Sequence, residues 1–222
     1  MKVEFWQRIW EERLIPFHQT RINLRLKEAY ADLRIPEGGL VFVPLCGKAY
    51  DMRWLALQGH PVLGVELSPI AVKEFFDEGG VKPVVRSDGR FERWSGRSVE
   101  ILLGDFFDLD QDHLSEVRGF YDRAALIALP VDMRLGYTDK LKAALPNNVR
   151  GLLLTIEYDQ SKMEGPPFSV PEDEVRSLFG PEFHIERWQA KDVREQSRFR
   201  ERLSSLVEKV YIISRSTRQL IC

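Results

Sequence analysis

The chain has 222 residues, of which 44% are hydrophobic and 30% are charged, enough for one α/β domain with a core of its own. Its 32 basic and 34 acidic residues give a net charge of −2, which argues against nucleic-acid binding through a general basic surface. No apolar run approaches the roughly 20 residues of a membrane span, and the charged start contains no signal-peptide core. The two cysteines, Cys46 and Cys222, lie far apart, which is typical of a reduced, cytoplasmic protein.

The first 34 residues predict two amphipathic helical stretches. Trp6 and Trp10 share one helical face in the first stretch, which Pro16 interrupts. Apolar side chains recur every four positions in the second stretch, which a turn at residues 36–39 ends.

The rest of the chain alternates short apolar runs with helical stripes, the pattern of βαβ units. The runs that predict strands lie at residues 40–44, 62–65, 99–103, 151–156, 185–188 and 207–213, with two shorter candidates at 84–85 and 91–94. Residues 121–127 predict a further strand and its exit loop. About seven strands separated by helices favour an open, doubly wound sheet.

In such a sheet, ligands bind beyond the carboxyl ends of the strands. Glu66 ends the second strand and lies 19 residues after Gly47, which belongs to the loop after the first strand. This offset is close to the ~20 residues that separate a nucleotide-binding loop from an acidic residue that binds ribose hydroxyls. The alternative is that Glu66 only caps the next helix.

The loop at residues 44–48 lacks both glycine-rich phosphate-binding patterns, although Lys48 follows Gly47. A pyrophosphate needs several glycines for close approach of the backbone, so the residues favour S-adenosylmethionine over a dinucleotide or ATP. After the third strand, Asp105 offers a hydrogen-bond acceptor and Phe106 an apolar face where an adenine would lie. Core packing is the alternative for Phe106.

Arg123 follows the end of the fourth strand, where the chemistry of such a sheet is expected. An arginine is no base at neutral pH, but it can hold an anion, either a cofactor carboxylate or a substrate thiolate. The alternative is an ion pair with Asp122 or another surface acid. Arg198 and Arg200 are secondary candidates for the same site, since an arginine-rich stretch is usually a solvated face.

The stretch V-P-L-C-G-K-x-x-D-M-x-W-L-A-x-x-G-H-x-V-x-G-V-E-L-S at residues 43–68 resembles the signature of the thiopurine S-methyltransferase family. The runs at 102–109, 121–130 and 166–170 and the tryptophan pair of the first helix resemble it too, and the pattern is most similar to the bacterial branch. The resemblance is loosest at residues 80–100 and 194–202.

This resemblance implies a class I methyltransferase, a Rossmann-like fold of three layers. Its doubly wound, mostly parallel seven-stranded sheet has the strand order 3-2-1-4-5-7-6, and residues 1–34 form a helical cover over the cofactor site of a single domain, 1–222. The implied activity is transfer of a methyl group from S-adenosylmethionine to the sulfur of an aromatic or heterocyclic thiol.

The resemblance also implies roles for single residues. Four match cofactor-binding positions of the family: Trp10, Leu45, Glu66 and Arg123. Asp105 and Phe106 match its adenine-side positions, and Phe17 matches a substrate-side aromatic residue. Arg123 is the expected catalytic residue, because its charge lowers the effective pKa of a thiol beside it.

The four histidines show no metal-ligand spacing with each other or with cysteine, so we expect no metal. We expect a cytoplasmic monomer that acts on a small-molecule thiol and binds neither nucleic acid nor membrane. The alternatives are a methyltransferase for another soft nucleophile, such as halide, thiocyanate, or selenium and tellurium compounds, and a non-catalytic nucleoside-binding module. The missing glycine fingerprint disfavours a dehydrogenase.

Overall fold

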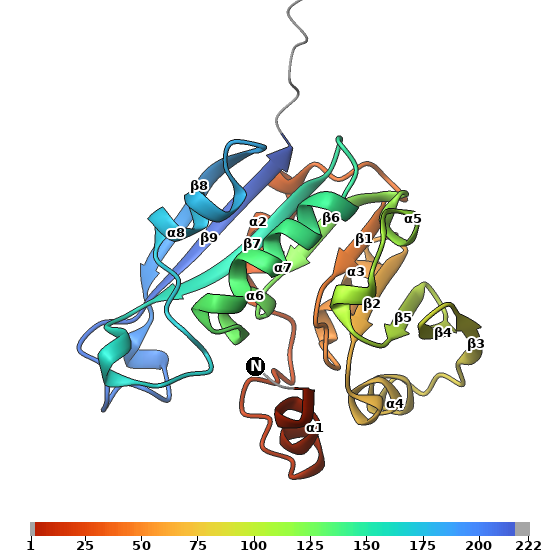
Figure 1. Ribbon diagram of the computed structural model, residues 1–222, viewed down its shortest axis with the longest axis horizontal. Coiled ribbons are helices and arrows are strands. Elements are labelled where there is room, and N and C mark those ends of the chain that lie inside the picture. The colour runs from red at the N-terminus through yellow and green to blue at the C-terminus, as the bar shows by residue number, and fades with distance from the viewer. Residues whose placement is uncertain (1–2, 216–222) are drawn as a thin grey trace, which may run out of the picture.

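The protein, described here by a computed structural model over residues 3–215, has one nine-stranded sheet between two layers of helices (Figure 1). The strands are β1 (Leu40–Val43), β2 (Val62–Glu66), β3 (Val84–Asp88), β4 (Phe91–Gly96), β5 (Val99–Leu103), β6 (Val117–Asp122), β7 (Arg150–Glu157), β8 (Phe183–Asp192) and β9 (Val207–Arg215). The helices are α1 (Val3–Glu11), α2 (Leu24–Leu33), α3 (Tyr50–Leu57), α4 (Pro69–Glu78), α5 (Gln111–Leu114), α6 (Ala125–Ala128), α7 (Val131–Ala144) and α8 (Glu172–Phe179). The two predicted N-terminal helices are confirmed as α1 and α2.

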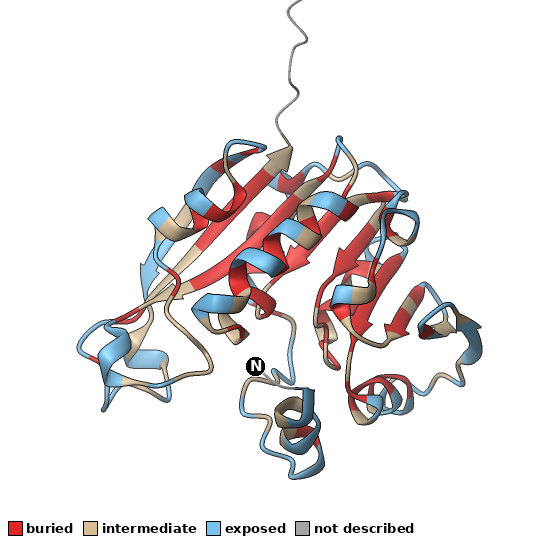
Figure 2. Cartoon of the chain, in the orientation of Figure 1, coloured by how far each residue is buried: buried red, intermediate tan, exposed pale blue. Residues whose placement is uncertain are grey.

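The core lies on both faces of the sheet. Side chains of α2, α3 and α4 pack with one face, and side chains of α5 to α8 pack with the other. Figure 2 shows the burial concentrated in the central strands, while the outer sides of the helices are exposed. All five residues of β2 are buried, because a central parallel strand is covered from both sides. The predicted three-layer architecture is therefore confirmed.

The strands follow the order β3-β4-β5-β2-β1-β6-β7-β9-β8. Without β3 and β4, the remaining seven, numbered along the chain, have the order 3-2-1-4-5-7-6, as the resemblance implied. The sheet is nonetheless larger and more mixed than expected. Within the described part of the chain, four neighbouring pairs are parallel and four are antiparallel.

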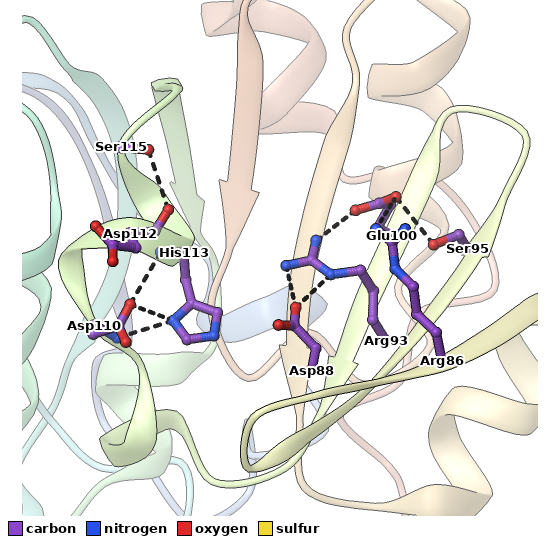
Figure 3. Close-up of polar contacts among 9 residues, drawn as sticks. All are labelled: Arg86, Asp88, Arg93, Ser95, Glu100, Asp110, Asp112, His113 and Ser115. Atoms are coloured by element: carbon purple, nitrogen blue, oxygen red, sulfur yellow. Dashed lines mark hydrogen bonds and ion pairs between the residues drawn. The ribbon is translucent and has the colours of Figure 1, made fainter.

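The two additional strands form a hairpin on the edge of β5. The short strands predicted at 84–85 and 91–94 are real, and both extend further than the apolar pattern indicated. Figure 3 shows the polar contacts that hold the hairpin: the Arg93 guanidinium bonds to Asp88 on β3 and to Glu100 on β5. Ser95 donates a second hydrogen bond to Glu100, 3.0 Å away. Charged cross-strand pairs, which hydrophobic periodicity does not detect, therefore extend the sheet.

The strand predicted with its exit loop at 121–127 begins earlier in the chain than expected. Strand β6 runs from Val117 to Asp122, and the chain then turns into α6. The turn is fixed by the Asp122 side chain, whose Oδ1 accepts hydrogen bonds from the backbone N–H groups of Ala125 and Leu126. The apolar residues after Asp122 thus belong to a helix.

Candidate functional site

A cavity of about 630 Å³ opens at the carboxyl ends of the central strands. Its walls come from α1 and the loop after it, from the loops that follow β1, β2 and β6, and from the end of β7 and the segment 196–199. Most of the lining side chains are apolar. Of the predicted site residues, five line the cavity: Trp10, Phe17, Leu45, Glu66 and Arg123.

Helix α1 forms the aromatic wall of this cavity and lies beside α4, beyond the ends of the central strands (Figure 1). Trp10 is its one buried residue among those described, with 3% of its surface exposed. The rings of Trp6 and Trp10 each meet the ring of Phe17 edge-on, with centroids 5.9 Å apart. Phe17 therefore joins the two tryptophans that the sequence placed on one helical face, and the three rings form an aromatic cluster.

An ion pair joins this N-terminal segment to a charged cluster on the body of the molecule. Lys48 Nζ lies 2.8 Å from Glu74 Oε2 and 2.6 Å from Glu78 Oε1, and Glu74 also pairs with Arg13 in the loop after α1. Burial alone would raise the pKa of Glu74, but its bonds to Lys48 and Arg13 lower that pKa overall. Glu74 is thus a charged link between the N-terminal segment and α4.

Glu66 is a buried carboxylate, 7% exposed, at the end of β2. Its Oε2 accepts a hydrogen bond from the Gly47 N–H and its Oε1 from the Ser68 N–H, both at 2.8 Å. Burial raises the pKa of Glu66, and these backbone hydrogen bonds oppose the rise. The Ser68 side chain caps α4, so the alternative role of Glu66 as the helix cap is wrong.

The loop after β1 turns sharply against Trp10. Leu45 and Gly47 both adopt left-handed backbone conformations, with φ of 44° and 53°. A Cβ on Gly47 would lie 3.3 Å from Trp10 Cζ2, so glycine lets the indole pack against the loop. A left-handed leucine costs energy, and such conformations persist where the surroundings fix them, often at functional sites. The loop thereby brings its backbone to the cavity.

Cys46, in the same loop, is buried, and burial raises its thiol pKa well above the ordinary value. A thiol in this state is a poor nucleophile, as expected for a packing residue. Cys222 lies outside the described residues.

Arg123 lines the cavity with its side chain 16% exposed, and its acidic partner is not the neighbouring Asp122. Arg123 Nε lies 3.1 Å from Oδ2 of Asp51, a residue of α3. Asp122 instead accepts a hydrogen bond from the Tyr137 hydroxyl at 2.7 Å, and burial raises its pKa to about 6. An ion pair was the alternative to anion binding by Arg123. The observed pair with Asp51 involves only the Nε side of the guanidinium.

Asp105 and Phe106 do not line the cavity. Asp105 Oδ1 accepts a hydrogen bond from the Phe107 N–H and caps a short 3-10 turn. The Phe106 ring is 3% exposed and packs against the ring of Tyr137, with centroids 4.8 Å apart. Their adenine-side roles stay predictions, and core packing accounts for the position of Phe106.

Two cavity residues carried little signal in the sequence. Arg198, in an arginine-rich stretch, lines the cavity, and its guanidinium lies over the Phe199 ring, 4.6 Å from the centroid. No other residue between 3 and 215 forms a hydrogen bond or ion pair with it. Arg200 is not on the cavity and pairs with Glu201. Thr155, at the end of β7, places a buried side chain on the cavity wall.

Among residues 3–215, no group of three or more histidine, cysteine and acidic side chains is placed to hold a metal ion. None of the helices in that range combines the length and apolar character that crossing a membrane requires.

Comparison with known proteins decides the family. Residues 1–216 match the family described as Thiopurine S-methyltransferase (TPMT). The chain is 48% identical to a thiopurine S-methyltransferase of Pseudomonas putida, over 97% of this chain and 100% of the relative. The protein belongs to the thiopurine S-methyltransferase family. A relative of the same name from Nitrosospira multiformis is 44% identical over 98% of this chain and 100% of its own length.

Solved structures confirm the fold of this family member. It is similar to Burkholderia thailandensis 1,6-didemethyltoxoflavin-N1-methyltransferase with bound S-adenosylhomocysteine, with a TM-score of 0.62 and 16% identity over 96% of this chain and 87% of the other. An S-adenosylmethionine-dependent methyltransferase from Anabaena variabilis gives a TM-score of 0.67 at 14% identity, over 96% and 95% of the two chains. The class I methyltransferase fold and the family's use of S-adenosylmethionine, both expected from the sequence, are thus confirmed.

Proposed function

We propose that the protein transfers the methyl group of S-adenosylmethionine to the sulfur of an aromatic or heterocyclic thiol. One observation carries this proposal beyond family membership: Glu66, Arg123 and the aromatic cluster of Trp6, Trp10 and Phe17 border one cavity. A nucleoside sulfonium needs an acceptor for its ribose, a cation for its carboxylate and an apolar or aromatic enclosure for its charged sulfur. The cavity provides all three.

The residues present fit this cofactor. Gly47 lets the Trp10 indole pack against the loop, and Gly47 and the Glu66 carboxylate both line the cavity. Glu66 would bind the ribose hydroxyls, while Leu45 would offer main-chain groups to the methionine part. Trp10 would face the sulfonium, a contact worth roughly 0.5–2 kcal/mol depending on desolvation. When bound, S-adenosylmethionine supplies an electrophilic methyl group.

Arg123 is assigned the catalytic role because it offers a fixed positive charge inside the cavity. It would hold the cofactor carboxylate or the substrate thiolate by charge-assisted hydrogen bonds. Near a thiol, this charge favours the thiolate and so lowers the thiol pKa. No strong base is then required, and the rate depends on bringing the sulfur in line at ~3–3.5 Å from the methyl carbon.

The part of the cavity that would hold the methyl acceptor suits a flat, anionic ring. Phe17 and Phe199 offer aromatic surfaces, and Arg198 offers a cation with no acidic partner among residues 3–215. A heterocyclic thiolate matches this combination, since apolar walls bind the ring and the cation binds its charge.

We also propose that residues 1–222 act as a single domain, as a monomer in the cytoplasm, and without nucleic acid. The net charge of −2 and the absence of a basic excess support the last point. Light scattering at micromolar concentration tests the monomer, and a fractionation of the producing cells tests the compartment.

The test of function has two stages. Calorimetric titration with S-adenosylhomocysteine should show binding at one site per chain. Turnover is then measured side by side with 6-mercaptopurine, iodide and a selenium compound, and the thiopurine should be methylated fastest. Faster turnover of iodide or the selenium compound would show that the preferred methyl acceptor is another soft nucleophile and not a thiol. Binding without transfer to any acceptor would leave a nucleoside-binding module.

A further inference from the structure

Asp51 is a buried acid directly behind the cavity that no role discussed so far requires. It lies in the first turn of α3 and is 2% exposed. Its Oδ1 accepts a hydrogen bond from the Asn23 N–H at 2.7 Å, and its Oδ2 accepts one from the Tyr121 hydroxyl at 3.2 Å. The same Oδ2 lies 3.1 Å from Arg123 Nε. One carboxylate therefore joins α3, β6 and the segment before α2.

The contact with Asp51 leaves most of the arginine available. A guanidinium has five N–H donors, one on Nε and four on the two Nη atoms. Asp51 takes the Nε side, and no residue in the described range 3–215 forms a hydrogen bond or ion pair with the Nη atoms of Arg123. Because Arg123 also lines the cavity, its unused donors are the ones that an anion there can reach.

We propose that Asp51 is a positioning residue, which holds the Nε side of Arg123 so that the two Nη groups meet the anion bound in the cavity. The fork of an arginine binds a carboxylate or thiolate well only when its plane is fixed. Asp51 fixes it from behind with a charge that water hardly reaches. This inference rests on the proposed function, since the anion is the cofactor carboxylate or the substrate thiolate.

The same acid ties the arginine to the N-terminal segment. Asn23 caps α2 through its side chain, which accepts from the Arg25 N–H, and donates its own N–H to Asp51. Asn23 also lines the cavity. The start of α2 and Arg123 thus contact the two oxygens of one carboxylate.

The test compares Asp51→Asn with a matched control, Tyr121→Phe. The first keeps the shape of the side chain but removes the charge that faces Arg123. The second removes another donor to the same carboxylate and leaves the Arg123 contact in place. Unfolding midpoints of both variants establish that they are folded. We expect Asp51→Asn to lower kcat/KM for 6-mercaptopurine by about ten- to hundred-fold, as expected for a misplaced catalytic group, and Tyr121→Phe to stay within about two-fold of wild type.

A second readout identifies the anion and separates positioning from general damage. Dissociation constants are measured for S-adenosylhomocysteine and for 5′-methylthioadenosine, which lacks the amino acid part. If Arg123 holds the cofactor carboxylate, Asp51→Asn weakens only the first ligand. If it holds the thiolate, both constants stay at wild-type values while turnover of the thiol falls. Equal weakening of both ligands would overturn the proposal.

A third measurement adds Asp51→Asn to a protein that already carries Arg123→Lys. In Arg123→Lys, adding Asp51→Asn should cost less than about two-fold, because the group that Asp51 positions is already gone. Asp51→Asn with near-normal kcat/KM, or Tyr121→Phe with an equal loss, would refute the positioning role. An inactive wild-type protein would instead overturn the proposed function, so the two failures are distinct.

Discussion

The carboxylate of Glu66 accepts a hydrogen bond from the Gly47 N–H at 2.8 Å, which fastens the end of β2 to the loop after β1. The two residues lie 19 positions apart in the sequence. This contact holds the carboxylate in one orientation and keeps the positive-φ turn at Gly47 in register with it. The carboxylate proposed to bind the ribose is therefore fixed by the backbone of the neighbouring loop.

Glu66→Ala is expected to weaken S-adenosylhomocysteine binding by roughly 1–3 kcal/mol, from the loss of charged hydrogen bonds. Isothermal titration calorimetry measures it. Glu66→Gln sets its amide NH2 against one of the two backbone N–H donors of Gly47 and Ser68, so it should weaken binding as well. A folded Glu66→Ala protein with an unchanged dissociation constant would remove Glu66 from the cofactor site.

Arg123→Lys is expected to lose most of the methyl-transfer activity, because an ammonium cannot replace a planar fork. Steady-state kinetics with 6-mercaptopurine measure the loss. Arg200→Lys is the matched control: it changes the same residue type next to Glu201, away from the cavity, and should leave turnover unchanged. Near-normal turnover of Arg123→Lys would contradict its assigned role.

Glu74→Gln is expected to loosen the N-terminal segment, since it removes the negative charge that pairs with both Lys48 and Arg13. Trypsin should then cleave after Arg13 several-fold faster than in wild type. The difference should shrink in 0.5–1 M salt, where charges are screened within a few ångströms. Lys73→Gln breaks an exposed pair with Asp77 on the same helix and serves as the control. Equal cleavage of all three proteins would show that these charges do not hold the segment.

Asp122 is expected to make the protein less stable as pH rises from 4 to 6. Its pKa is about 6 in the folded protein against 3.8 in the unfolded chain, so the folded state binds more protons in this window. By linkage, the stabilising contribution is fully present below 3.8 and is lost as pH rises through 6, a change of about 3 kcal/mol. Urea unfolding of wild type and Asp122→Asn from pH 4 to pH 7 should show this difference. A constant difference between the two proteins would contradict it.

The sequence predicted the sheet well where apolar runs are continuous. The buried strands β1, β2 and β7 were located from such runs, and the resemblance supplied their order. The prediction was less accurate where a strand carries both polar and apolar side chains. Strands β3 and β4 are longer than predicted because Arg93 and its acidic partners, rather than apolar periodicity, extend them.

The candidate site was predictable in part for a related reason. Glu66 ends β2 and Arg123 directly follows β6. The rule that ligands bind beyond the carboxyl ends of the strands was therefore enough to predict both at the same edge of the sheet. Asp51 stands on a helix, and its partners Asn23 and Tyr121 are 28 and 70 positions away, a relationship that no local pattern encodes. Phe106 shows the opposite case, since a position after a strand did not bring its ring to the cavity.

Helix α1 has nine residues, and an isolated helix shorter than about 12–15 residues is only marginally stable in water. Its Trp10 is nevertheless buried, against surfaces that also border the cavity. A ligand that packs against this aromatic wall therefore reinforces the helix as well as gaining contacts of its own. The heat-capacity change of cofactor binding should then be more negative than the apolar area of the ligand alone accounts for. The additional part would come from apolar surface that α1 buries when the ligand binds.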